Sequence, residues 1–145
     1  MKRADYAYFL AIPTRWMDND VYGHVNNVVY YAYFDTVINR YLIDEGGLDI
    51  HASDIIGLCV ESQCKYLSPV AFPDALEGGL RVKRLGTTSI VYEVGIFRAG
   101  QDEACAFGQF VHVFVDRASR TKAPIPTQIA RAISKIVRLE ETSGA

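Results

Sequence analysis

The segment from Asn27 to Glu45 has the pattern of a long helix that is enclosed on most sides. Residues 28–44 are mostly Val, Tyr, Ala, Phe, Ile or Leu, and the polar exceptions form one narrow stripe made of Asp35, Thr36, Asn39, Arg40 and Asp44. A helix with so little polar surface must be covered by the rest of the chain. Asn26 or Asn27 is suited to cap its start, and Gly46 and Gly47 are suited to end it.

The remaining chain has mainly the pattern of strands. In residues 89–98, for example, Ile90, Tyr92, Val94 and Ile96 alternate with other residues and define one apolar face. Glycine and proline mark turns between such segments. The predicted strands cover residues 9–14, 55–67, 75–85, 89–98 and 104–116, and a C-terminal helix covers 129–139. This order predicts an α+β fold in which an antiparallel β-sheet, largely a meander, wraps around one long central helix.

Length, composition and charge narrow the possible roles. The chain has 145 residues, of which 50% are hydrophobic, and this predicts one domain spanning residues 1–145. A net charge of -2 provides no basic field for nucleic acid. The chain has no apolar stretch long enough to cross a bilayer and no signal-peptide pattern at its start. Its three cysteines, an odd number, favour reduced thiols in a cytoplasmic protein. Residues 140–145 are predicted to form a disordered tail.

Residues 15–27, RWMDNDVYGHVNN, place two acids, a histidine, a glycine and two asparagines just before the helix. The first turn of a helix has backbone N–H groups without partners, and the helix dipole favours negative charge there. A carbonyl held at that point would be polarised, while the carboxylate of Asp20 could attack it or activate water. Asp20 and the backbone amide near Asn27 are therefore the main catalytic candidates.

The other polar residues of this segment have competing interpretations. Asp18 could share the site with Asp20, although a structural role is favoured. His24 could hold the loop through hydrogen bonds to the backbone, or orient water or a substrate carbonyl. The segment holds only one histidine, whereas catalytic metal sites usually have three well-placed ligands. The sequence therefore predicts a reaction that needs neither a metal nor another cofactor.

Segment 15–27, followed by helix residues Tyr30, Tyr33, Phe34 and Asp35, resembles the hotdog-fold acyl-CoA thioesterases, in particular their 4-hydroxybenzoyl-CoA thioesterase-like branch. Segments 66–70, 72–74, 85–89 and 115–117 match the same branch in the same order. The resemblance implies a hotdog fold, Asp20 as the catalytic carboxylate, and the amide near Asn27 as the group that polarises the carbonyl. Within the resembling segment, His24 is a further catalytic candidate, and the candidate substrate-binding residues are Tyr22, Gly23, Val25, Asn26 and Tyr30.

The predicted function is thus that of an acyl-CoA thioesterase. An exposed sheet edge and apolar helix surface predict a homodimer or homotetramer. One alternative is a non-catalytic module that binds acyl thioesters. A second, less favoured alternative is an enoyl-thioester hydratase. Hotdog hydratases have an aspartate and a histidine five residues apart with an Asn-Pro pair between them, whereas Asp20 and His24 are four apart without that pair. The acyl group, the choice between CoA and acyl carrier protein, and the role of Asp20 as base or nucleophile stay open at this point.

Overall fold

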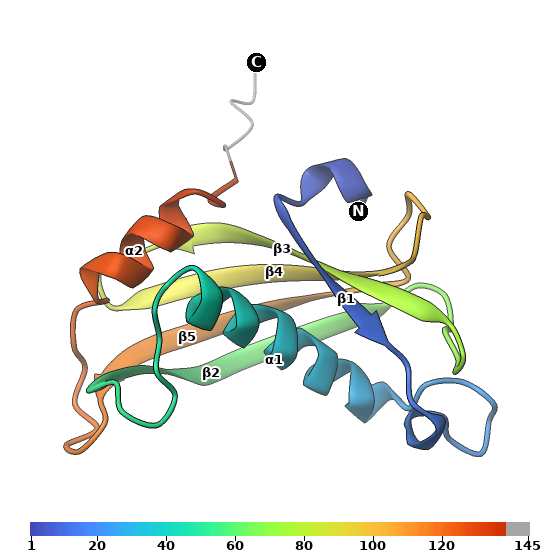
Figure 1. Cartoon of the computed structure of the whole chain (residues 1–145), viewed down its shortest axis with the longest axis horizontal. Coiled ribbons are helices and arrows are strands. Elements are labelled where there is room, and N and C mark those ends of the chain that lie inside the picture. Colours follow the sequence, from blue (N-terminus) through green and yellow to red (C-terminus); the bar gives the residue numbers. More distant parts are fainter. Residues whose placement is uncertain (139–145) are drawn as a thin grey trace.

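A five-stranded antiparallel sheet curves around one long helix in the computed structural model, which describes residues 1–138 (Figure 1). The strands lie in the order β1-β3-β4-β5-β2. The elements are β1 (Tyr8–Pro13), α1 (Asn27–Asp44), β2 (Ile55–Tyr66), β3 (Ala75–Leu85), β4 (Ser89–Arg98), β5 (Ala106–Asp116) and α2 (Thr127–Ser134), with short 3-10 turns at Arg3–Asp5 and Trp16–Asp18. The predicted α+β architecture, including the meander of β3, β4 and β5, is confirmed.

Helix α1 lies on the inner face of the sheet, over the half that contains β1, β3 and β4. It packs mainly against β1, β3 and β4, and its side chains Phe34, Val37 and Ile38 are completely buried. At Gly78 in β3 a Cβ atom would lie only 2.3 Å from the side chain of Val37, so the close contact of helix and sheet requires glycine there. Within residues 1–138, neither α1 nor α2 is long and apolar enough to cross a membrane.

The two edges of the sheet differ. At the first edge, β1 pairs with β3 as far as Leu80, and beyond this the C-terminal segment takes over. There the N–H of Val82 donates to the carbonyl of Ile136, and the N–H of Arg138 donates to the carbonyl of Val82. At the second edge, β2 has no backbone partner on its outer side within residues 1–138. Residues 58–63 of β2 are exposed on both faces. Proteins usually cover or shorten such an open edge strand, because its unpaired backbone groups can bind another chain.

The C-terminal helix differs from its prediction over residues 129–139. It begins earlier, at Thr127, and ends at Ser134, because the following residues run beside β3 and bond to Val82. Backbone groups at a sheet edge need partners, and this need outweighs the helical pattern of the segment. The last strand also starts at Ala106 rather than at residue 104. Residue 139 and the tail 140–145 lie outside the described residues.

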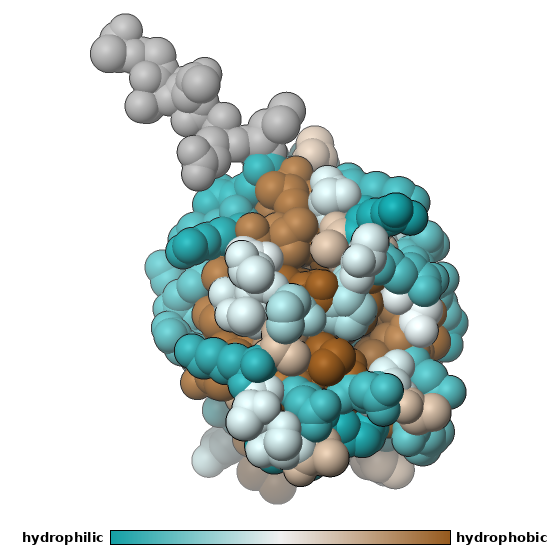
Figure 2. All heavy atoms as spheres, turned by 90° about the vertical axis from the view of Figure 1, so that its left-hand side faces the viewer, coloured by the Kyte–Doolittle hydropathy of each residue, from teal (hydrophilic) through white to brown (hydrophobic). Residues whose placement is uncertain are grey.

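The end of the molecule at which α1 stops has hydrophobic side chains in its centre and hydrophilic ones around them (Figure 2). A hollow of about 230 Å³ lies at this end, between the loop after α1 and the start of α2. Its apolar lining comes from Leu48, Ile55, Pro126 and Ile129. The chain therefore leaves space at the C-terminal end of α1.

His112 is a buried histidine on the inner face of β5. Its ring lies against that of Tyr92 with 4.9 Å between the centroids, and the residue is 4% exposed. Neither its Nδ1 atom nor the hydroxyl of Tyr92 has a hydrogen-bond partner within residues 1–138. Burial disfavours the charged ring and lowers the pKa of His112 from 6.5 to about 4.

The low pKa of His112 predicts a loss of stability in mild acid. Between pH 6.5 and 4 the unfolded chain binds a proton at this position and the folded chain does not, so the free energy of unfolding falls as the pH falls. Over this whole pH range, the free energy of unfolding falls by about 3 kcal/mol because of His112. Urea unfolding of the wild type and of His112→Gln across this range should give a steeper pH dependence for the wild type. Parallel curves would contradict this prediction.

Candidate active site

The loop before α1 folds into a small hairpin that brings Asp20 and His24 together. The N–H of Asp20 donates to the carbonyl of His24 at 2.9 Å, and the N–H of Gly23 donates to the carbonyl of Asp20 at 3.2 Å. Gly23 has φ +87, a conformation that residues with a side chain rarely adopt. In this turn the carboxylate of Asp20 accepts the N–H of Tyr22 at 2.9 Å and lies 4.0 Å from Nδ1 of His24.

Bonds to the segment before β3 fix this hairpin in place. The N–H of Val25 donates to the carbonyl of Val70 at 2.7 Å. The side-chain oxygen of Asn19 accepts the N–H of Phe72 at 2.9 Å. The positions of Asp20 and His24 therefore depend on a segment about fifty residues later in the chain.

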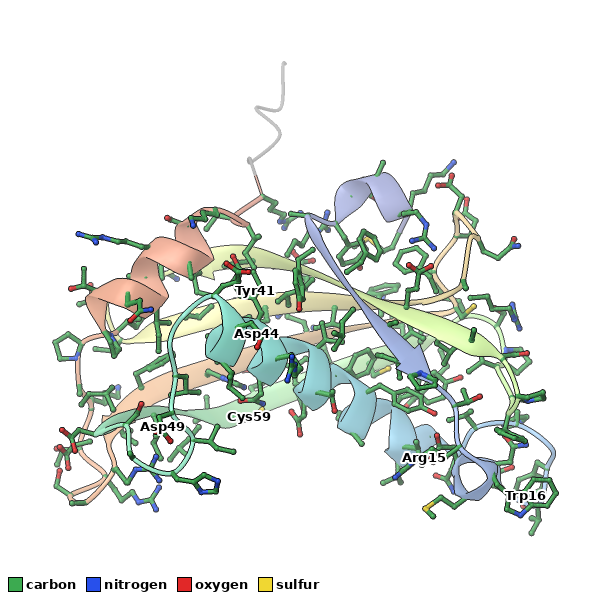
Figure 3. All side chains as sticks on the ribbon, in the orientation of Figure 1. Arg15, Trp16, Tyr41, Asp44, Asp49 and Cys59 are labelled. Carbon is green, nitrogen blue, oxygen red and sulfur yellow. The ribbon has the colours of Figure 1, made fainter. Side chains whose placement is uncertain are left out.

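Asp18 anchors the hairpin to α1 from inside the protein. It is 0% exposed, and its carboxylate accepts the hydroxyl of Tyr33 at 2.6 Å and the N–H of Arg15 at 2.9 Å. The Arg15 guanidinium also pairs with the carboxylate at 2.9 Å. Burial opposes ionisation of Asp18, but the bonds from Tyr33 and Arg15 together outweigh it and lower the pKa. Arg15 lies near the first turns of α1, while Trp16 extends at the outer end of the loop (Figure 3).

The structural interpretation of Asp18 is thus confirmed. Because Trp16–Asp18 is a 3-10 turn and not an extended segment, Asp18 points into the core and not alongside Asp20.

The start of α1 leaves one backbone amide without a partner. Asn26 is the cap: its side-chain oxygen accepts the N–H of Val28 at 2.9 Å, and its carbonyl accepts the N–H of Val29 at 2.9 Å. The N–H of Asn26 itself donates to the carbonyl of Asp18. Within residues 1–138, the amide of Asn27 has no hydrogen-bond partner. It therefore lies at the positive end of the helix dipole with its donor free.

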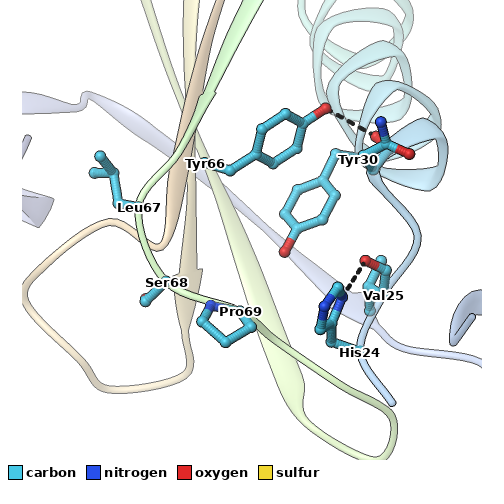
Figure 4. A pocket seen from close by; sticks show the side chains of 8 residues that line it. His24, Val25, Tyr30, Tyr66, Leu67, Ser68 and Pro69 are labelled. Carbon is cyan, nitrogen blue, oxygen red and sulfur yellow. Dashed lines mark hydrogen bonds between the residues drawn. The ribbon is translucent and has the colours of Figure 1, made fainter. Parts of the chain in front are cut away.

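A pocket of about 320 Å³ opens beside this amide (Figure 4). Its lining is made of His24, Val25, Asn27, Tyr30, Tyr66, Leu67, Ser68 and Pro69. The hydroxyl of Tyr66 donates to the carbonyl of Asn27 at 3.0 Å, and its ring meets that of Tyr30 edge to face at 5.1 Å. A mostly apolar hollow of this size with a few polar groups has the character of a small-molecule site.

The pocket brings together four of the predicted site residues: His24, Val25, Asn27 and Tyr30. The other predicted residues do not line it within one chain. Asp20 lies beside His24, Asn26 caps the helix, and Tyr22 and Gly23 form the exposed turn. The sequence interpretation missed residues 66–69 as part of the site. Only the Tyr-Leu-Ser-Pro pattern at a strand end pointed to them. The contact that brings them to the site, from Tyr66 of the strand to Asn27 of the helix, is not visible in the sequence.

Within residues 1–138, no cluster of three or more His, Cys, Asp or Glu side chains has the arrangement of a metal site. Cys59, Cys64 and Cys105 are free thiols. The pocket lining contains the imidazole of His24 and the residue Asn27, and the carboxylate of Asp20 lies next to His24.

Comparison with known proteins decides the family. The profile of the thioesterase-like superfamily matches residues 14–133. The chain belongs to this superfamily. Among solved structures, the PA5185 protein of Pseudomonas aeruginosa is 54% identical, with a TM-score of 0.93 over 94% of this chain and 95% of that one. The PA2801 protein of the same organism, a presumed thioesterase, is 31% identical, with a TM-score of 0.80 over 86% and 96% of the two chains.

More distant structures agree on the hotdog fold. A 1,4-dihydroxy-2-naphthoyl-CoA thioesterase from Synechocystis is 20% identical, with a TM-score of 0.79 over 89% of this chain and 96% of that one. At this identity the likeness bears on the fold alone. No curated protein matches the chain closely enough to add to the comparison.

The contacts of Asp18 predict the effect of removing one hydroxyl. Tyr33→Phe leaves a completely buried carboxylate with one donor fewer, which should lower the free energy of unfolding by about 1–3 kcal/mol. Tyr31→Phe is the matched control, since within residues 1–138 its hydroxyl makes no hydrogen bond. The control should stay within about 0.5 kcal/mol of the wild type in urea unfolding. Equal losses in the two variants would contradict the anchoring role of Asp18.

Proposed function

We propose that the protein is an acyl-CoA thioesterase, which hydrolyses the thioester to a free acid and CoA. The observation that carries this proposal is the amide of Asn27, which has no partner in the described part of the chain. Asn27 lies at the start of α1 and lines a pocket together with His24, the neighbour of Asp20. A binding module gains nothing from an acid beside an electrophilic carbon. A hydrolase needs both a hydrogen-bond donor that polarises the carbonyl and a base or nucleophile.

In this mechanism the thioester carbonyl accepts the N–H of Asn27, and the helix dipole stabilises the negative charge that develops on its oxygen. Asp20 acts in one of two ways. As a base, it takes a proton from water while the water oxygen bonds to the carbonyl carbon. As a nucleophile, it bonds to that carbon itself and forms a mixed anhydride, which water then cleaves. In both routes the C–S bond breaks and the CoA thiolate leaves and takes up a proton.

The remaining predicted residues have supporting roles in this proposal. His24 holds the hairpin beside Asp20, since its Nδ1 lies 3.4 Å from the carbonyl of Val25 and 4.0 Å from the Asp20 carboxylate. Val25 and Tyr30 contact the thioester region from the pocket wall. Asn26 keeps the helix start in shape, and Tyr22 and Gly23 contact the CoA part at the mouth. No metal or other cofactor takes part.

The active form is proposed to be a homodimer, alone or within a homotetramer. Within residues 1–138, every exposed large hydrophobic side chain lies in the loop before α1, at the helix start, or on β2 and its flanking loops. These residues are Trp16, Met17, Val21, Tyr22, Val28, Ile50, Leu58, Val60, Tyr66 and Leu67. Two copies joined along β2 would pair its open edge and cover this surface in a self-complementary way.

Such a dimer also affects the site. The pocket lies between the start of α1 and the end of β2, next to the proposed interface. A second copy would cover its open side and exclude water from it. Lower local polarity strengthens the interaction of the developing oxyanion with the Asn27 amide.

Asp20→Asn should lower kcat for acyl-CoA hydrolysis by at least about a hundredfold, because asparagine can act neither as base nor as anionic nucleophile. The assay follows release of CoA with a thiol reagent, and circular dichroism checks the fold. An unchanged kcat in a folded variant would refute the role of Asp20 and favour a binding module.

His24→Ala is expected to reduce kcat less than Asp20→Asn does, because the carboxylate carries the chemistry and the imidazole mainly supports the loop. Both variants should be measured with the same substrate and at the same pH. A loss as large as that of Asp20→Asn would place His24 among the groups that transfer protons.

Val60→Lys should weaken the dimer by at least about tenfold, because a lysine would lose its hydration at the centre of an apolar interface. Sedimentation at several protein concentrations gives the dissociation constant. Ala11→Lys, an exposed position of β1 on the opposite sheet edge, is the control and should leave it unchanged. A wild-type protein that stays monomeric at micromolar concentration would overturn the dimer.

A further inference from the structure

Tyr66 lies across the space between the end of β2 and the start of α1. Its hydroxyl bonds to the carbonyl of Asn27 at 3.0 Å, and its ring packs edge to face on Tyr30 with 5.1 Å between the centroids. Figure 4 shows the side chain extending from the strand toward the helix. The bond and the ring contact fix the ring of Tyr66, which is 45% exposed, as a bar along one wall of the pocket.

Beyond this bar, the seam between α1 and β2 continues along the helix. Cys64 and Tyr31 are half-buried beside it, and Tyr31 packs on Phe34 and Phe110 at 6.0 and 5.9 Å. Helix α1 packs mainly against β1, β3 and β4, and residues 58–63 of β2 beside this seam are exposed. At the far end of the seam lies a second hollow of about 180 Å³, whose lining includes Leu42 and Gly57.

The direction of the substrate follows from its chemistry. The CoA part is large and highly charged, so it stays outside the protein, at the mouth formed by the exposed hairpin. With the CoA part at the mouth and the thioester carbonyl at Asn27, the acyl chain is taken to extend along α1, past the half-buried side chains of Tyr31 and Cys64. Tyr66, which lines the pocket and bonds to the Asn27 carbonyl, would then lie at the start of that path.

We propose that Tyr66 is a specificity-determining residue, whose ring limits the length of the acyl chain that the pocket accepts. This inference rests on the proposed thioesterase function and adds a substrate class to it: short or compact acyl groups that end before the Tyr31, Cys64 and Phe110 part of the seam.

Two substitutions separate the ring of Tyr66 from its hydroxyl. Tyr66→Ala removes the bar and should open the pocket to the seam. Tyr66→Phe keeps the ring but removes the bond to the Asn27 carbonyl. If the ring sets the length limit, the alanine variant changes the preferred chain length and the phenylalanine variant keeps it.

The experiment measures binding in the Asp20→Asn background, so that the substrate is not consumed. Dissociation constants are determined by calorimetry for saturated acyl-CoAs from butanoyl- to hexadecanoyl-CoA. Three proteins are compared side by side: one that keeps Tyr66, one with Tyr66→Phe and one with Tyr66→Ala. With Tyr66 or Tyr66→Phe, the affinity should stop rising or fall beyond a short chain. With Tyr66→Ala it should continue to rise by about fourfold for each further methylene that enters the seam.

The same chain-length profile in a folded Tyr66→Ala variant would overturn the proposal. A shifted profile in Tyr66→Phe as well would also overturn it, since the hydroxyl and not the ring would then set the limit. Hydrolysis by the wild type is measured separately. If Tyr66→Ala shifts the binding profile but the wild type hydrolyses no acyl-CoA, the length limit stands and the thioesterase function fails. If no variant binds any acyl-CoA, both fail.

Discussion

The buried carboxylate of Asp18 is the interaction on which the site depends. A charged group that is 0% exposed is stable only if donors surround it, and Tyr33 of α1 and Arg15 of the loop supply them. The backbone carbonyl of the same residue accepts the N–H of Asn26, the cap of α1. One residue thereby ties the hairpin that carries Asp20 to the helix whose first residue, Asn27, lines the pocket. This anchor acts together with the bonds of Val25 and Asn19 to the segment before β3.

The capping of α1 shows how structural and chemical needs are divided among adjacent residues. The side chain of Asn26 satisfies the N–H of Val28, and its carbonyl satisfies that of Val29. The amide of Asn27 has no hydrogen-bond partner among residues 1–138, and its carbonyl accepts a hydrogen bond from Tyr66 at the end of β2. The helix start is therefore both well capped and able to donate one hydrogen bond. The hydrogen bond from Tyr66 to the Asn27 carbonyl places the ring of Tyr66, which we propose limits the acyl chain, beside this amide.

The position of α1 explains why the exposed apolar surface is gathered in one region. Close packing of Val37 on Gly78 brings the helix over β3, and residues 58–63 of β2 stay exposed. The edge of β3 is closed by β1 and by the C-terminal segment at Val82, whereas β2 stays open within residues 1–138. A chain with this asymmetry has one surface suited to a second copy. In our proposal, the same surface covers the pocket.

The sequence by itself determined the helix and the meander, and it indicated the residues that we propose for catalysis. The apolar pattern of residues 28–44 and the alternation in β4 are local signals, because each depends on neighbouring residues. The sequence left the cap open between Asn26 and Asn27, and the structure selects Asn26. Only the tertiary structure decided the orientation of Asp18, the contribution of Tyr66 to the pocket and the early end of α2. Each of these rests on a partner far away in the chain: Tyr33, Asn27 or Val82. No local pattern encodes such a contact, since it forms only when burial and backbone pairing bring the segments together.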